Sequence, residues 1–211
     1  MKLKQLEGLL QNFDVFEKPK VHLEQYPTTP HIASHMLYTI DQTFDDIQGG
    51  TVADLGCGCG ILSVGAAILG SDYVVGFDID ADALEVAKKN LEECDVDVVE
   101  FIQCNVADIN SAMMRNGFFD TVIMNPPFGT KNNAGIDVMF LEKAIHMANQ
   151  TVYSLHKTST RHHIDKKAKQ NNVDMEVVAE LKFNLDASLK FHRRKSVDIE
   201  VDFIRFDVSG R

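Results

Sequence analysis

The first fifty residues carry apolar side chains at helical spacing. Leucines at positions 3, 6, 9 and 10 recur every three or four residues, which is typical of one face of a helix over residues 2–12. A second helix is expected to begin at Thr29 and Pro30, because threonine is a favoured N-cap and proline suits the first helical position. Its apolar stripe contains Ile32, Met36, Ile40 and Phe44. We therefore expect a helical segment over residues 1–48.

From residue 51 onward, short apolar runs alternate with helical patterns. The strands are expected near Thr51–Leu55, Tyr73–Phe77, Val98–Gln103, Thr121–Met124 and Thr151–Leu155. The helices are expected near Leu62–Leu69, Ala81–Glu92, Asp137–Ala148 and Thr160–Gln170. The first strands are short and rich in β-branched residues, as strands are when helices cover both faces of a parallel sheet.

Two longer strands are expected to follow, near Glu176–Phe183 and Val197–Phe206. The second alternates apolar with acidic positions, so one of its faces should meet water or a polar helix. A parallel α/β sheet that ends in an antiparallel pair is the organisation of class I methyltransferases, an inference from fold analogy alone. We expect one domain over residues 1–211, with a Rossmann-like α/β core over residues 49–211 and a seven-stranded, mostly parallel sheet whose C-terminal strand is antiparallel.

Composition excludes several classes of protein. Hydrophobic residues make up 45% and charged residues 25% of the 211 positions, which is ordinary globular usage and not that of a disordered, collagen-like or coiled-coil chain. No apolar run approaches the roughly 20 residues that span a bilayer, and the N-terminus lacks a secretory apolar stretch. An intracellular protein without a membrane segment is expected. Cys57, Cys59, Cys94 and Cys104 include no C-x-x-C pair, so neither a disulfide framework nor a metal site is expected.

The formal net charge of −10 is unevenly distributed. Residues 151–195 carry ten Lys and Arg against five Asp and Glu, whereas residues 1–150 are strongly acidic. A basic block on an acidic chain is compatible with a surface that faces phosphates. On charge alone, a solvated helix face and a charged loop are the simpler interpretation.

A glycine-rich loop, residues 56–60, ends the first strand and precedes a helix. Glycines allow a sharp turn and a close approach of the backbone to a ligand. Asp78 ends the next strand, where a carboxylate can accept both hydroxyls of a ribose. The loop spacing is G-x-G-x-G, not the dinucleotide spacing G-x-G-x-x-G, and Asp54 beside it suits a cation and would repel a pyrophosphate. These features predict S-adenosylmethionine, with a tight turn and no ligand as the alternative.

The run Asn125, Pro126, Pro127 and Phe128 follows the fourth strand, at the edge where parallel sheets place their chemistry. The Asn125 side chain and the Pro126 carbonyl can accept the two hydrogens of a planar amino group. Phe128 offers a flat surface on which a base can stack. The run predicts N-methylation of a planar amine, such as adenine N6, cytosine N4 or a glutamine amide. A rigid proline turn with a buried Phe is the alternative.

With residues 24–28, 129–133 and 153–157, these motifs resemble the methyltransferase-like protein five family, the eukaryotic 18S ribosomal RNA adenine-N6 methyltransferases, over nearly the whole chain. The resemblance implies that S-adenosylmethionine contacts Gln25 and Thr28 at its methionine end, Gly56, Cys59 and Ile61 along its backbone, Asp78 at its ribose, and Asn105 and Val106 at its adenine. Family members carry Asp in place of Asn105, so we expect weaker cofactor binding through the Asn105 carbonyl.

The resemblance also implies a heterodimer with a small zinc-ribbon activator protein. In the strand order 3-2-1-4-5-7-6, the segment Val98–Ile102 would be an edge strand with few charges and no proline, open to a partner strand. The RNA contacts are expected at Lys131, Lys190, Phe191, Arg193, Arg194 and Lys195. A protein glutamine-N5 methyltransferase, which uses a similar N-P-P motif, is the alternative, and a non-catalytic cofactor-binding scaffold is a third. We expect the protein in the nucleus, the nucleolus and the cytoplasm, and the compartment in which it acts stays open.

Overall fold

The structure, a computed structural model, describes residues 1–110, 112, 114–129, 133–186 and 196–210, with the backbone alone at 184–186 and 196–198. The elements are α1 (Leu3–Leu10), η1 (Val21–Leu23), α2 (Pro30–Phe44), β1 (Thr51–Leu55), α3 (Ile61–Ile68), β2 (Tyr73–Asp78), α4 (Ala81–Glu92), β3 (Val99–Gln103), η2 (Val106–Asp108), β4 (Phe119–Met124), α5 (Ile136–Met147), β5 (Ala148–Lys157), η3 (Thr158–Thr160), α6 (Arg161–Gln170), β6 (Asp174–Asp186) and β7 (Ser196–Asp207). Every predicted helix and strand is present. The short 3-10 helices η1, η2 and η3 were not predicted.

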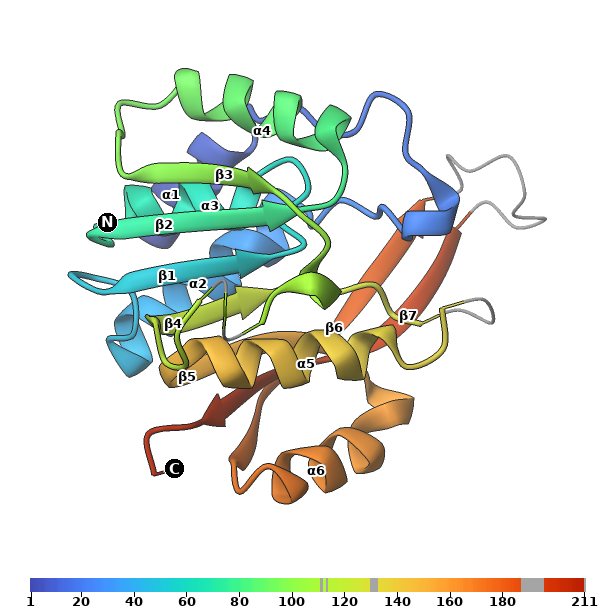
Figure 1. The fold of residues 1–211 in the computed structure, drawn as a ribbon. Helices are drawn as coiled ribbons and strands as arrows, with labels where there is room; N and C mark the ends of the chain where they lie inside the picture. Colours follow the sequence, from blue (N-terminus) through green and yellow to red (C-terminus); the bar gives the residue numbers. More distant parts are fainter. Residues whose placement is uncertain (111, 113, 130–132, 187–195, 211) are drawn as a thin grey trace.

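The seven strands form one sheet in the order β3-β2-β1-β4-β5-β7-β6 (Figure 1). Strands β1 to β5 pair in parallel, and β7 runs antiparallel to both β5 and β6. The predicted order and the antiparallel C-terminal strand are confirmed. This is the α/β sheet expected of the class I methyltransferase fold.

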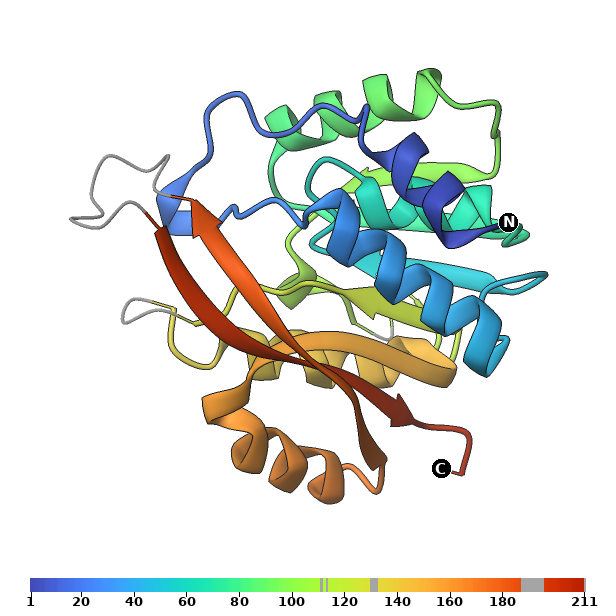
Figure 2. The same cartoon turned by 180° about the vertical axis from the view of Figure 1, so that it is seen from behind.

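Helices cover both faces of the sheet. Helices α1, α2 and α3 lie on one face, and α5 and α6 lie on the other (Figures 1 and 2). Helix α4 packs against α3 and β3. The first face buries an apolar cluster that includes Leu6, Leu37, Val52, Ile123 and Tyr153. Because leucines of α1 and α2 share this cluster with the strands, the N-terminal helices are part of the main core and are not an appendage.

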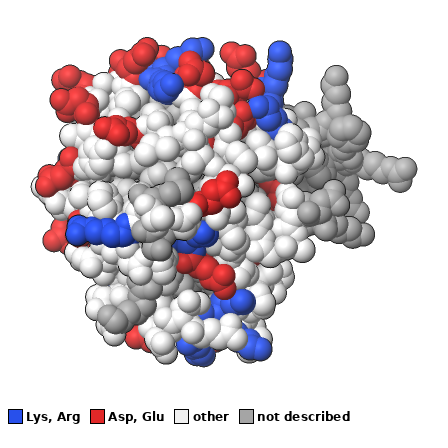
Figure 3. All heavy atoms as spheres, in the orientation of Figure 1, with Lys and Arg blue, Asp and Glu red and all other residues white. Residues whose placement is uncertain are grey.

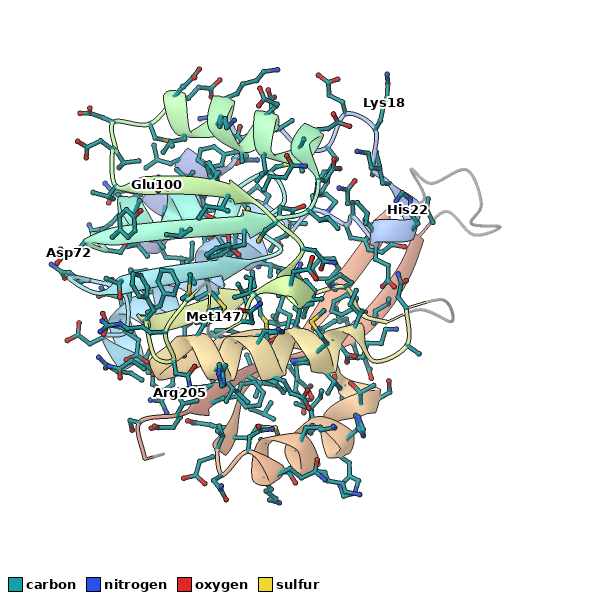
Figure 4. All side chains as sticks on the ribbon, viewed as in Figure 1. Lys18, His22, Asp72, Glu100, Met147 and Arg205 are labelled. Carbon is teal, nitrogen blue, oxygen red and sulfur yellow. The ribbon has the colours of Figure 1, made fainter. Side chains whose placement is uncertain are left out.

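The carboxyl ends of β1, β2 and β4 meet at one edge of the sheet. Leu55, the last residue of β1, pairs with Phe77 of β2 and Met124 of β4. The glycine loop, Asp78 and Asn125 therefore leave the sheet side by side. Residues 11–29, here called the N-terminal strap, run over this edge between α1 and α2 (Figure 2). In Figure 4, Lys18 and His22 of the strap lie at this edge, whereas Asp72 lies at the opposite edge.

The acidic face of β7 is partly buried by the first turn of α6. Asp202 is fully buried, and its carboxylate accepts hydrogen bonds from Arg161 Nε at 2.6 Å and Thr158 Oγ1 at 2.7 Å. Burial alone would raise the pKa of Asp202, but the hydrogen bonds from Arg161 and Thr158 outweigh it and lower the pKa. At Asp202 the predicted polar helix is confirmed, while the neighbouring Glu200 is exposed.

Charged side chains are unevenly distributed over the surface. Figure 3 shows acidic side chains, with some lysines among them, over α4, and lysine and arginine side chains around α6. Several bases of α6 have acidic partners, since Arg161 binds Asp202, Lys167 binds Glu142 and Lys169 binds Asp165. Neighbouring acidic side chains therefore offset part of the positive charge of α6. No helix within the described part of the chain is long and apolar enough to cross a membrane.

Candidate functional site

The glycine loop turns sharply between β1 and α3. Gly58 and Gly60 have φ angles of +53° and +80°, a region that residues with a Cβ rarely adopt. A Cβ on Gly58 would lie 2.9 Å from the Phe16 ring, and a Cβ on Gly60 would lie 3.0 Å from the Phe101 ring. Side chains at Gly58 and Gly60 would therefore collide with these rings. Both its conformation and its packing explain the glycines.

Asp78 joins the end of β2 to this loop. Its Oδ2 accepts a hydrogen bond from the Gly58 amide at 2.8 Å, and its Oδ1 accepts one from the Asp80 amide at 2.8 Å. Burial raises the pKa of Asp78 despite these two donors. Each oxygen has a second lone pair for a ligand hydroxyl. The predicted pairing of loop and acid is present in the structure.

Asp54 lies beneath the loop with one oxygen in use. Its Oδ2 accepts from Ser63 Oγ at 2.6 Å, while its Oδ1 is buried and has no hydrogen-bond partner among the described residues. Burial raises the pKa of Asp54 to about 7. A buried carboxylate oxygen that lacks a partner is stabilised by a cation. The residues present therefore fit the positive end of S-adenosylmethionine.

Two adjoining cavities lie between the strap and the sheet edge. The larger has a volume of about 240 Å³, and the predicted residues in its lining are Gln25, Gly56, Asp78, Asn105, Val106, Asn125 and Pro127. The smaller has a volume of about 70 Å³, and the predicted residues in its lining are Thr28, Asp54, Gly56, Cys59, Ile61 and Asn125. Gly56 and Asn125 line both cavities. The division fits a nucleoside in the larger cavity and an amino-acid portion in the smaller one.

The strap covers these cavities and is held by polar contacts of residues 20–25. Lys20 Nζ lies 2.5 Å from Asp80 Oδ1 and 2.7 Å from Asp82 Oδ2. Gln25 donates from Nε2 to Asp80 at 2.6 Å and accepts from the Lys20 amide at 2.7 Å. Burial alone would raise the pKa of Asp80, but Lys20 and Gln25 lower it. On the other side, Asn133 Nδ2 donates to the His22 carbonyl at 3.0 Å.

Asn125 and Phe128 have different surroundings. Asn125 Nδ2 donates to Thr28 Oγ1 at 2.8 Å, at the junction of the two cavities. Phe128 is only 8% exposed, and its ring packs edge-on against Phe183 with centroids 5.9 Å apart. Lys157 Nζ lies 5.9 Å from the Phe128 ring centroid. In this structure Phe128 is part of the core beside the site, so the predicted stacking surface is covered by these neighbours.

Asn105 caps the short helix η2. Its Oδ1 accepts a hydrogen bond from the Ala107 amide at 3.0 Å. The oxygen predicted to accept the adenine amine thus already has one donor, and its second lone pair is the remaining acceptor.

The sequence did not single out the aromatic and aliphatic walls. Those walls include Phe16, Tyr26, Ile79, Ile136 and Phe140. Ile79 directly follows Asp78 and is 48% exposed in the structure. Its position next to the predicted ribose-binding acid is a sequence signal that could have identified it. The sequence analysis also did not predict a buried cluster of polar side chains, Asp137, Ser154 and His156. His156 Nε2 lies 2.9 Å from Ser154 Oγ and His156 Nδ1 lies 3.7 Å from Asp137 Oδ2, which links β5 to the first turn of α5.

The predicted RNA contacts Lys131, Lys190, Phe191, Arg193, Arg194 and Lys195 lie outside the described residues. The four cysteines are free thiols, and burial raises the pKa of Cys59 to about 12, so this thiol stays protonated. Within the described part of the chain, no three His, Cys, Asp or Glu side chains are grouped as a metal ion would require.

Comparison with known proteins agrees with this geometry. Residues 31–157 match the family described as Methyltransferase small domain. The rRNA N(6)-adenosine-methyltransferase METTL5 of Danio rerio is 62% identical over 98% of this chain and 99% of its own length. The Mettl5 protein of Drosophila melanogaster, with the same description, is 50% identical over 99% of this chain and 97% of its own. A crystal structure of a candidate RNA methyltransferase from Pyrococcus horikoshii has a TM-score of 0.85 at 35% identity and covers 98% of both chains. This chain therefore belongs to the Methyltransferase small domain family and, within it, to the METTL5 family of rRNA N(6)-adenosine-methyltransferases.

Proposed function

We propose that this protein transfers a methyl group from S-adenosylmethionine to the exocyclic N6 of an adenosine in 18S ribosomal RNA. The observation that carries the proposal is the position of Asn125, which lines both the cavity with Asp78 and the cavity with Asp54. With the cofactor's nucleoside in the larger cavity and its amino-acid portion in the smaller one, the methyl group would lie where the two cavities join, next to the Asn125 side chain.

The residues around the cavities suit the parts of the methyl donor. Asp78 would hold the ribose hydroxyls and Asn105 and Val106 would hold the adenine, since all three residues line the larger cavity. Asp54, which lines the smaller cavity, would stabilise the positive end. When bound, S-adenosylmethionine supplies a methyl group on a positively charged sulfur, which is already a strong methyl donor. The protein then has to position the acceptor nitrogen and exclude water.

The acceptor nitrogen of adenine is planar and a poor nucleophile because its lone pair is delocalised into the ring. The Asn125 Oδ1 and the Pro126 carbonyl can accept its two hydrogens, which favours a tetrahedral nitrogen whose lone pair is directed at the methyl group. These interactions strengthen as the nitrogen becomes tetrahedral, so they accelerate the reaction itself and do not merely tighten binding.

Two relatives that are 62% and 50% identical to this chain are named for ribosomal RNA, which supports RNA as the substrate. The basic run Lys190 to Lys195 supplies charges for phosphate contacts. We place the protein in the nucleus, nucleolus and cytoplasm, where 18S RNA is made and used. We also propose that it is the catalytic subunit of a heterodimer with a small zinc-ribbon activator that pairs with β3.

The test is single-turnover methyl transfer to an 18S RNA fragment, followed by mass spectrometry of the nucleosides. Asn125→Ala should lower the rate by roughly 100- to 1000-fold, since it removes an acceptor used in the transition state, while the affinity for S-adenosylmethionine should fall far less. Asn149→Ala, at an exposed position at the start of β5, is the matched control and should keep the wild-type rate. Methylation of a glutamine peptide in place of the RNA would establish the protein-glutamine alternative.

A further inference from the structure

The contact between Thr28 and Asn125 joins the strap to the end of β4. The Thr28 hydroxyl oxygen lies 2.8 Å from Asn125 Nδ2, and Thr28 is only 9% exposed. The two residues are far apart in the sequence, and each lies next to a rigid element. The contact is therefore a feature of the tertiary structure that no local sequence pattern predicts.

Thr28 is held in place by the start of α2. Thr29 is the N-cap, with its Oγ1 accepting from the Ile32 amide at 3.3 Å, and Pro30 is the first helical residue. The helix behind them is anchored in the core through buried Met36 and Ile40. The Thr28 hydroxyl consequently has little freedom to move relative to the sheet.

Asn125 is held with similar rigidity. It directly follows β4, whose last residue, Met124, pairs with Leu55 of β1 and Ser154 of β5. Two prolines come next and restrict the backbone on the other side. What remains free is the rotation of the Asn125 amide, whose two ends differ in chemistry because Nδ2 can only donate and Oδ1 can only accept.

The orientation of this amide decides whether the site can hold an amine. With Nδ2 donating to Thr28, Oδ1 is the end available to accept an amine hydrogen. In the opposite orientation, Nδ2 would face the amine, and two donors would oppose each other. We propose that Thr28 is a positioning residue that holds Asn125 in the orientation needed for methyl transfer, an inference that rests on the proposed function.

The location of Thr28 explains why its hydroxyl acts as the acceptor. Thr28 also lines the smaller cavity, the one that contains Asp54. A hydroxyl has one hydrogen, and once its oxygen accepts from Nδ2 this hydrogen is left for an acceptor in that cavity, such as the carboxylate of the methionine portion. Occupation of the smaller cavity therefore stabilises the active orientation of Asn125, and the cofactor and amine sites are coupled through one side chain.

The experiment compares Thr28→Val, which keeps the shape but removes the hydroxyl, with Thr28→Ser, which keeps it. At saturating RNA and S-adenosylmethionine, Thr28→Val should lower turnover about ten-fold, the effect of losing one hydrogen bond. Thr28→Ser should keep most of the wild-type turnover. In the Asn125→Ala background, Thr28→Val should have no further effect because there is no amide left to orient. The side-chain amide signals of Asn125 in NMR spectra should shift in Thr28→Val without RNA present.

The possible results separate the two roles of Thr28. If Thr28→Val weakens S-adenosylmethionine binding but reaches wild-type turnover at saturation, Thr28 is only a cofactor contact and the inference is wrong. Equal losses from Thr28→Val in the wild-type and Asn125→Ala backgrounds would also overturn it. In either case the loss of activity in Asn125→Ala alone still tests the proposed function, so the two can fail separately.

Discussion

At the scale of single residues, Asp54 carries an unusual ionisation. Its carboxyl is enclosed beneath the glycine loop, and this burial raises its pKa to about 7, although the hydrogen bond from Ser63 opposes the shift. Near neutral pH the group is therefore partly protonated in the protein without ligand. A cation placed beside the free Oδ1 favours the ionised form and lowers the pKa.

This ionisation makes cofactor binding dependent on pH. Below pH 7 Asp54 must lose a proton before it can pair with the cation, so affinity for S-adenosylmethionine should rise with pH from 6 to about 7 and then level off, with up to one proton released per binding event at the lower pH. Calorimetric titrations in buffers of different ionisation enthalpy measure this proton release. Asp54→Asn should abolish the pH dependence, and Asp72→Asn, at an exposed position on the opposite edge of the sheet, should preserve it. Proton release that persists in Asp54→Asn would assign it to another group.

Residues of the site differ in how well the sequence predicts them. Asp54, Asp78 and Asn125 were predicted because each lies at or directly after the carboxyl end of a strand, and the ends of parallel strands share one edge of the sheet. Phe128 was predicted as a stacking surface but is covered by Phe183 and Lys157. These neighbours come from later strands, so the residues around Asn125 contain no sign of them.

At the scale of elements, the junction of β7 with α6 depends on one ion pair, between the buried Asp202 and the partly exposed Arg161. Arg161 binds Asp202 through Nε and Nη2 and also reaches Glu180 on β6. The array links two strands and the start of a helix at the antiparallel end of the sheet. Alternation along β7 predicted a polar face, but the arginine that fills it could not be identified from the sequence, because many bases lie in the same region.

Removal of the buried carboxylate should destabilise this junction. Asp202→Ala should lower the free energy of unfolding by about 2 kcal/mol, since Arg161 and Thr158 lose a buried partner. Because the pKa of Asp202 is lowered, its contribution is present above the unfolded-state pKa of about 3.9 and is lost as the pH falls through its folded-state value. Urea unfolding measures both effects. Glu200→Ala, at an exposed position on the same strand, should change stability by less than about 0.5 kcal/mol, and equal losses for the two variants would contradict the role given to the ion pair.

At the scale of the whole molecule, the sheet was predictable and the strap was not. Buried β-branched runs and the helices between them predicted the strands, and such parallel strands require crossover connections of one hand. The strand order itself was taken from the resemblance to methyltransferases. The strap has no periodic pattern between α1 and α2. It is held by Asp80, Asn90 and Asn133, which lie in other parts of the chain. The position of the strap over the site therefore depends on tertiary contacts and could not be predicted from the sequence.

The edge of the sheet gives the last prediction. Among the described strands, β3 pairs with β2 alone, and its residues Glu100 and Ile102 are exposed, with Ile102 at 41% (Figure 4 shows Glu100). An edge strand with an exposed isoleucine is open to pairing with another chain.

If the zinc-ribbon activator pairs with this edge of the sheet, Ile102→Asp should weaken its binding by at least about ten-fold, as expected for a buried charge without a partner. Leu9→Asp, which changes a leucine of similar exposure on α1, should bind the activator normally. Calorimetry of the two purified proteins measures the affinity, and the activator should also raise the melting temperature of the wild-type chain. If the isolated chain is a stable monomer whose melting temperature the activator does not change, or if Ile102→Asp binds the activator normally, the activator does not pair with β3.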